Sequence, residues 1–292
     1  MRSRRPTGFS LVEMAVVVVI MGIMLALGLK TLQATQESAA TSETRAKQER
    51  IKIALISFLR TNGRLPCPDI AAAPTGIEPA ACATAASGYG VLPWASLGLA
   101  REAAVDGWSN FFTYRVATAT VTPAAPAVPL VPRAQNNAQN WTQKTATGFN
   151  IGSLTSPTAG GFLSLQIDQR NNAGVLSTIA YNAAVVVYSH GKTGRGARTP
   201  FGTVIAAPTG ADEVVNNTAG TTRFILRDYT EAAAATGGVY DDVVAFITPQ
   251  DLLQPMLDDK TLKGVCSSYC VAPAAGCVAA AVPIGNPAPT CP

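Results

Sequence analysis

The chain has 292 residues, of which 48% are hydrophobic and 14% are charged, and its formal net charge is +4. Its single histidine disfavours zinc sites and acid–base relays, because these generally draw on more than one imidazole. The net charge is too small and too scattered to indicate a nucleic-acid-binding surface, and 25 glycines with 20 prolines argue against a compact helical bundle. Strands, turns and long loops are expected instead.

The N-terminus combines a basic head with a long apolar segment. Arg2, Arg4 and Arg5 precede residues 9–29, in which Glu13 is the one charged residue. As a helix this segment would measure about 32 Å, close to the thickness of the hydrocarbon core of a bilayer. The positive-inside rule then places the start of the chain in the cytoplasm and everything beyond Lys30 across the membrane. A cleaved secretory signal would have a shorter apolar region with a small-residue cleavage site after it.

Residues 8–14, GFSLVEM, resemble the type IV prepilin signal shared by type IV pilins and type II secretion pseudopilins. In that family a membrane peptidase cuts after the glycine and methylates the new N-terminal phenylalanine. The resemblance therefore implies processing between Gly8 and Phe9. It also implies that Glu13, as the fifth mature residue, pairs with the N-terminal amine of a neighbouring subunit, which would offset the cost of a carboxylate in an apolar span. The alternative is an ordinary signal anchor with a stray glutamate near its end.

A long helix is predicted to follow from the same segment. Residues 30–60 contain no proline or glycine and are rich in good helix formers. Apolar residues recur at three- and four-residue spacing from Ile51 to Leu59, and Asn62-Gly63 supplies a stop. The helix is therefore expected over residues 9–62. The resemblance implies an α+β, pilin-like fold, in which the first half of this helix (9–29) spans the membrane or lies in the filament core and the second half packs on an antiparallel β-sheet domain with long loops.

The globular domain is expected over residues 63–264. Strands are predicted at 111–117, 162–167, 178–188, 223–227 and 243–247, with a short helical turn at 92–99 and an exposed insertion over 118–145. Thr248 and Pro249 supply an N-cap and a first-turn proline, which predicts a helix over 249–258. Residues 265–292 form a tail rich in cysteine, proline and alanine.

Three further segments extend the resemblance. DGWSN at 106–110, SHGKTG at 189–194 and YDDVV at 240–244 are similar, in order, to short motifs of pseudopilins and minor pilins. The major pseudopilin of the family has a calcium-binding loop in this region, so Asp241 and Asp242 could supply oxygen ligands for calcium. No EF-hand pattern is present and the intervening sequence departs from the family's acidic loop, so the alternative is a solvated turn before a strand.

The Gly-Lys-Thr at 191–193 follows an apolar strand, as a phosphate-binding loop would. However, Val186 stands where the first glycine is required, and Gly194, Gly196 and Pro200 prevent the helix that would hold the phosphate. No nucleotide is therefore expected. His190 is expected to be a surface or hydrogen-bonded loop residue, and no catalytic residues are predicted.

An even number of cysteines in an oxidising periplasm predicts disulfides. Six cysteines allow fifteen pairings, but their grouping favours Cys67 with Cys82 and two bridges within the tail. A zinc site in the tail is the alternative, although the tail has no close Cys-x2-Cys pair. The six cysteines are Cys67, Cys82, Cys266, Cys270, Cys277 and Cys291.

These patterns predict a structural subunit of a type IV pilus or a type II secretion pseudopilus, with no catalysis and no cofactor other than calcium. Its partners would be other pilin or pseudopilin subunits, prepilin peptidase and the inner-membrane assembly platform. It would begin as a single-pass inner-membrane protein and end in a periplasmic pseudopilus or a surface pilus. Removal of the eight-residue leader leaves 284 residues, 19 basic and 18 acidic, a size that favours a minor subunit.

Two alternatives belong to other functional classes. The first is a minor pilin at the filament tip, whose insertion (118–160) or Cys-rich tail contacts a surface, DNA or a secreted substrate. The second is a membrane-anchored enzyme, which is disfavoured because the sequence has no acid–base constellation.

Overall fold

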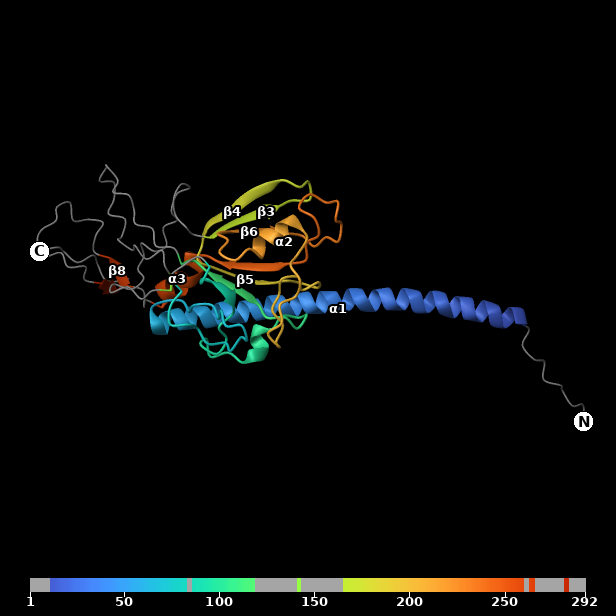
Figure 1. Ribbon diagram of the computed structural model, residues 1–292, viewed down its shortest axis with the longest axis horizontal. Coiled ribbons are helices and arrows are strands. Elements are labelled where there is room, and N and C mark those ends of the chain that lie inside the picture. Colours follow the sequence, from blue (N-terminus) through green and yellow to red (C-terminus); the bar gives the residue numbers. More distant parts are fainter. Residues whose placement is uncertain are drawn as a thin grey trace, which may run out of the picture.

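The computed structural model describes residues 11–82, 86–118, 141–142, 165–259, 263–265 and 281–283, without the side chains of residues 25–34, 182, 257, 263–265 and 281–283. It is an α+β structure with a long N-terminal helix, α1 (Leu11–Asn62), and a globular domain against the C-terminal half of that helix. The N-terminal half of α1 extends away from the domain as a bare rod (Figure 1). The expected insertion falls largely outside the described residues, and so does most of the tail.

The C-terminal half of α1 packs on the domain along one face. This face consists of Thr44, Gln48, Ile51, Leu55 and Leu59, which are spaced three or four residues apart and are all buried. The apolar members join the hydrophobic core, and the Gln48 side chain donates hydrogen bonds to the carbonyls of two strands. The N-terminal end of this face is therefore polar and its C-terminal end is apolar.

The predicted helix stop is confirmed. Gly63 has a φ of 66°, in the left-handed region that favours glycine, and its N–H donates a 2.8 Å hydrogen bond to the carbonyl of Leu59. The chain therefore turns back toward the domain directly after Asn62.

The first sheet is four-stranded and antiparallel. Its strands lie in the order β1 (Tyr89–Val91), β2 (Thr113–Val116), β5 (Val185–Ser189) and β7 (Val243–Ile247). β2 and β5 are wholly buried, which the nearly continuous apolar sequence of β5 favours, and α1 packs against the β5 and β7 side. β1 and β7 are therefore the two edges of this sheet.

The second sheet lies farther from α1 (Figure 1). Its order is β4 (Leu176–Ala183), β3 (Leu165–Arg170) and β6 (Arg223–Arg227), with β3 and β4 antiparallel but β3 and β6 parallel. The expected antiparallel sheet is therefore present, and the parallel pairing of β3 with β6 is an addition that was not expected. The single strand predicted over 178–188 is wrong: the chain leaves β4 at Ala183 and enters β5 of the other sheet at Val185.

Short elements complete the domain. The helix α3 (Pro249–Asp258) has the predicted bounds and packs on α1. The 3-10 helix η1 (Arg101–Ala104), the helix α2 (Ala211–Asn216) and the paired strands β8 (Lys263–Val265) and β9 (Ala281–Pro283) are elements that the sequence analysis did not predict. Residues 92–99, expected as a helical turn, form a series of turns.

Candidate functional site

The described N-terminal part of α1 is apolar on every side and uncovered. A soluble domain rarely exposes a continuous apolar surface of this kind, and a helix that is apolar all round is normally buried. This part of α1 therefore requires lipid or protein around it. Its large apolar side chains are between 43% and 87% exposed: Leu11, Val12, Met14, Val16, Val17, Val18, Val19, Ile20, Met21, Ile23 and Met24.

Glu13 lies in the first turn of α1 and is exposed. A carboxylate in the first turn is favoured by the positive end of the helix dipole. The two residues of the predicted processing site, Gly8 and Phe9, lie outside the described residues. Among the described residues, Glu13 is therefore the charged residue nearest to that site in the sequence, and it interrupts an otherwise apolar surface.

Among the residues that the structure describes, no helix combines the length and the apolarity needed to cross a bilayer. The predicted span, residues 9–29, begins before the first described residue and includes side chains that are not described.

The three short segments that extended the sequence resemblance meet in the folded domain. The Asp106 carboxylate accepts hydrogen bonds from the N–H groups of Trp108 and Asn110, both at 2.9 Å, and from the Ser189 hydroxyl at 2.5 Å. Asp241 in turn accepts a 2.6 Å bond from the N–H of Thr193. Each segment therefore holds the next, which is a structural role for all three.

The third segment also contributes to an acidic cluster. Glu213, Asp241 and Asp242 are all buried, and one carboxylate oxygen from each lies within 4.8 Å of the others. Glu213 comes from α2, 28 residues before Asp241, and accepts a 2.8 Å hydrogen bond from the N–H of Asp241. Burial excludes the alternative that Asp241 and Asp242 form a solvated turn. The sequence analysis missed Glu213 because it belongs to no motif.

The electrostatics of the cluster are those of acids with too little positive charge nearby. Burial, followed by the hydrogen bond with Asp241, raises the pKa of Glu213 to about 7, and burial raises the pKa of Asp242 well above its usual value. The cluster is therefore expected to hold protons at neutral pH unless a cation supplies the missing charge. Carboxylate oxygens are ligands that calcium prefers. Each carboxylate of the cluster could bind a cation with one oxygen and accept a hydrogen bond from the protein with the other.

His190 is part of the packing of the domain. Its ring is buried, with Nε2 2.9 Å from the Thr113 hydroxyl and Nδ1 2.8 Å from the carbonyl of Arg195. Nδ1 must donate to the carbonyl, and in the neutral ring Nε2 then accepts from the hydroxyl. The pKa of His190 is lowered to about 4, mainly by burial. Its hydrogen-bonded environment was predicted in outline, but its complete burial was not.

The predicted disulfide between Cys67 and Cys82 is present. It closes a loop in which the Glu78 carboxylate accepts two 2.7 Å hydrogen bonds from Arg64 and one of 2.9 Å from the N–H of Cys67. The remaining four cysteines, Cys266, Cys270, Cys277 and Cys291, lie outside the described residues.

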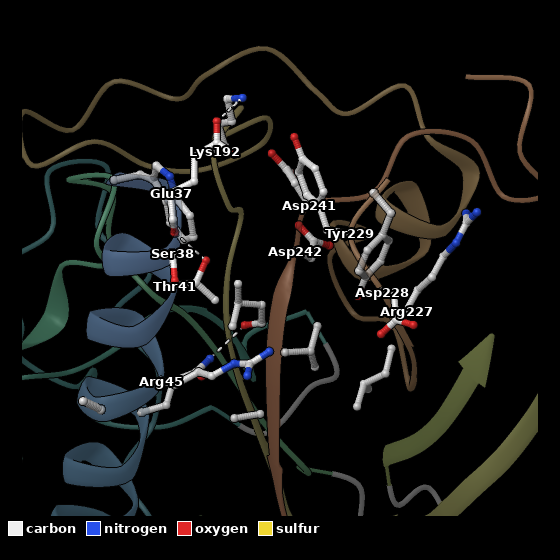
Figure 2. Close-up of a pocket in the computed structure, with 18 of the residues that line it drawn as sticks. Glu37, Ser38, Thr41, Arg45, Lys192, Arg227, Asp228, Tyr229, Asp241 and Asp242 are labelled. Atoms are coloured by element: carbon white, nitrogen blue, oxygen red, sulfur yellow. Dashed lines mark hydrogen bonds and ion pairs between the residues drawn. The ribbon is translucent and has the colours of Figure 1, made fainter. Parts of the chain in front are cut away.

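A groove of about 860 Å³ lies beside the acidic cluster. Figure 2 shows Glu37, Ser38, Thr41 and Arg45 of α1 along one wall, with Asp241 and Asp242 opposite them. The apolar part of the lining includes Trp108, Leu226, Tyr229 and Val244. No pattern in the sequence indicates this groove, since its walls come from segments more than a hundred residues apart.

Comparison with known proteins identifies one part of the chain. No curated protein and no solved structure matches the chain. The prokaryotic N-terminal methylation motif matches residues 3–29, which contain Gly8, Phe9 and Glu13 and run into the exposed apolar part of α1. The chain therefore carries the N-terminal signature of type IV pilins and pseudopilins.

Proposed function

We propose that this protein is a structural subunit of a type IV pilus or a type II secretion pseudopilus. The observation that carries the proposal is the continuity of the methylation motif with an apolar helix that the domain leaves uncovered. A motif of this kind on a helix already buried in its own domain would argue against assembly. Here the helix is free to pack with others.

The expected mechanism uses the two halves of α1 differently. The C-terminal half is fixed to the domain by Ile51, Leu55 and Leu59, which are part of its hydrophobic core. Before assembly the apolar half would lie in the inner membrane, and in the filament it would pack against the same half of neighbouring helices. Burying one Val, Leu, Ile or Met side chain contributes about 1.5–3 kcal/mol, so even partial burial of this surface would hold subunits together.

Glu13 would set the register of these helices. A carboxylate in an apolar bundle is unfavourable unless an opposite charge is close, and the methylated amine of Phe9 in a neighbouring subunit would supply it. Arrangements in which this pair is not formed would be disfavoured. Prepilin peptidase and the inner-membrane assembly platform are the remaining partners in this proposal.

The test is the N-terminus of the protein purified from its natural membrane and filament fractions. Mass spectrometry should find N-methylated Phe9 as the first residue, and the processed protein should be recovered in sheared filaments or in an overproduced pseudopilus. A chain that retains Met1, or that is cleaved beyond the apolar segment, would refute the proposal.

A minor subunit at the filament tip is the second candidate. The observation that favours it is size, because 284 residues after processing are many for a subunit present along a whole filament. Such a subunit would bind a surface, DNA or a secreted substrate through its exposed head. Its copy number per filament, measured by quantitative mass spectrometry, separates the candidates: one or a few copies would favour the tip, and many copies would favour the shaft.

We further propose that the cluster of Glu213, Asp241 and Asp242 holds calcium. The supporting observation is the burial of three carboxylates together, which leaves negative charge without an equal positive charge. A bound divalent cation would keep all three ionised and would join α2 to the start of β7, which stabilises the wall of the groove. Calcium binding would thus be a structural role, and no reaction is proposed.

A further inference from the structure

An exposed phenylalanine lies at the tip of a rigid hairpin. Arg198 and Val204 form an isolated antiparallel bridge, and inside it the N–H of Thr199 donates a 2.8 Å bond to the carbonyl of Thr203. The Gly202 N–H closes the turn by bonding to the Thr199 carbonyl at 2.9 Å, with Gly202 at a φ of 84°. Phe201 at this tip is 96% exposed.

The hairpin is held from two sides, so the position of Phe201 is fixed relative to the head. Arg101 of η1 donates a hydrogen bond to the Pro200 carbonyl, and Arg198 donates one to the carbonyl of Ala72 in the disulfide-closed loop. That loop runs beside β1, because Asp69 pairs with Val91. The tip therefore lies at the β1 edge of the four-stranded sheet.

The surroundings of the tip are basic and partly apolar. Arg101 is exposed, Arg198 is half-buried, and Val204 is 57% exposed. A rigid aromatic side chain flanked by arginines has the composition of an interface anchor, since Phe, Tyr, Trp and Arg are enriched at the centres of protein interfaces.

The groove of Figure 2 has the complementary composition and lies at the opposite edge of the same sheet, β7. Its apolar lining could receive an aromatic ring. Two exposed carboxylates of its lining, Glu49 and Asp228, lie where an incoming arginine could reach them. Of the other charged residues in the lining, Asp241 and Asp242 belong to the buried acidic cluster, Glu37 forms an ion pair with Lys192, and the remaining basic residues are Arg45 and Arg227.

We infer that the Phe201 hairpin of one copy inserts into the groove of a second copy of this chain, so that heads join edge to edge in the filament. This inference rests on the proposed role as a filament subunit. A contact between two different surfaces at opposite edges is heterologous, and a heterologous contact repeated without closure generates a helical array. In a helical array of copies with parallel α1 helices, the β1 edge of one head would face the β7 edge of the next.

Site-specific photo-crosslinking in the native host tests the contact. Full-length copies with two different tags are co-expressed, and p-benzoylphenylalanine replaces Phe201 in one of them. The expected result is an adduct between position 201 and the 226–245 segment or α1 residues 37–49 of the other copy. The probe placed at Tyr229, on the groove wall, should capture the 198–204 hairpin in return. Tyr181, a half-exposed aromatic on β4, is the matched control position and should give neither adduct.

A substitution gives an independent measure. Phe201→Ser leaves Pro200 and Gly202 to form the turn, so the head should fold normally, and the ratio of filament to membrane protein should fall about tenfold, as for a central interface residue. Tyr181→Ser should change that ratio by less than about twofold.

The outcomes separate this inference from the proposed function. Processed protein in filaments, with adducts only to other proteins or none above the Tyr181 control, would overturn the contact and leave the filament role standing. Adducts to a different pilin-like subunit alone would also overturn it, in favour of a tip position. Protein that is never cleaved at Gly8-Phe9 or never enters filaments would overturn both.

Discussion

The Ser189 hydroxyl donates a 2.5 Å hydrogen bond to the Asp106 carboxylate, across 83 residues of sequence and inside the protein. The same carboxylate organises its own turn through the N–H groups of Trp108 and Asn110. The turn in addition packs directly on α1, because a Cβ at Gly107 would lie 2.3 Å from the carbonyl oxygen of Ala40. Asp106 therefore joins β5 and the turn at the place where the head meets the helix.

Asp106→Ala should lower the free energy of unfolding by about 3 kcal/mol or more, because it leaves two buried donors and one part-buried donor without their acceptor. Glu102→Ala, which removes a nearby exposed acid, should change it by less than about 0.5 kcal/mol. Urea unfolding of the full-length protein in detergent, followed by tryptophan fluorescence, measures both. Equal stability of the two variants would show that the Asp106 bonds are not needed.

The secondary-structure elements that could be predicted are those marked by a short, continuous sequence pattern. β6, β7 and α3 have the predicted bounds, because each has a run of strand formers or a cap and a first-turn proline at its start. The division between β4 and β5 could not be predicted, since Ala183 and Ala184 carry no turn signal and the break depends on pairing with different neighbours. α2 was missed because it has six residues and its N-cap is Gly210, which has no side chain to cap the helix.

The candidate sites that could be predicted are likewise those marked by residues close together in the sequence. The processing motif is contiguous, so residues 8–14 are sufficient to recognise it, and the Cys67–Cys82 bridge followed from the separation of two cysteines from the other four. Glu213 and the walls of the groove come together only through the parallel pairing of β3 with β6 and the packing of α1 on β7. No spacing in the sequence records those contacts.

Replacing both Cys67 and Cys82 with serine should lower the free energy of unfolding by about 3 kcal/mol, the chain-entropy value for a loop of this length. The loop also holds the contact with Arg198, so the hairpin should become more susceptible to protease. Ala81→Ser, an exposed change in the same loop, is the control. An unfolding midpoint within error of the control would contradict the prediction.

His190 should make the domain less stable as the pH falls from about 6.5 to about 4. In the folded state its pKa is lowered to about 4, mainly by burial, whereas the unfolded chain has the ordinary value near 6.5. Between these values the unfolded state takes up a proton that the folded state does not, so the free energy of unfolding decreases, by about 3 kcal/mol over the whole range.

The comparison with His190→Gln isolates this effect from the other titrating groups. At pH 7 the variant should be the less stable of the two, because it loses the packing of the ring. The difference should shrink toward pH 4, since only the wild type carries the histidine penalty. Denaturant unfolding at pH 7, 6, 5 and 4 gives the difference directly, and a difference that is constant with pH would refute the prediction.

Calcium should stabilise the domain through the acidic cluster. Binding to the folded state alone would add about 2.7 kcal/mol at a calcium concentration one hundred times the dissociation constant. Thermal unfolding in calcium and in EGTA should differ for wild type but not for Glu213→Gln or Asp241→Asn. Asp258→Asn, an exposed change on α3, should keep the wild-type response, and identical unfolding of wild type in the two buffers would exclude the calcium site.

Glu13→Ala should leave membrane insertion and cleavage at Gly8-Phe9 intact but impair incorporation into filaments. Removing the carboxylate makes the apolar segment more apolar, so insertion should be no worse. The loss should arise at assembly, where the amine of Phe9 in the adjoining subunit would enter the helix bundle without its counter-charge. A buried charge that loses its partner typically costs about 3–5 kcal/mol, which is enough to exclude a subunit.

The measurement is the ratio of variant protein in sheared filaments to variant protein in the inner membrane, with wild type expressed in the same cells. Glu43→Ala is the matched control, because Glu43 lies on the same helix and makes only a surface pair with Lys47, which is worth little. Glu13→Gln should behave like Glu13→Ala, since the amide keeps the shape but not the charge. If both Glu13 variants enter filaments as well as the Glu43 control, with cleavage confirmed by mass, the pairing of Glu13 with Phe9 has no part in assembly. An intermediate loss for Glu13→Gln alone would instead show that a hydrogen bond supplies part of the contact.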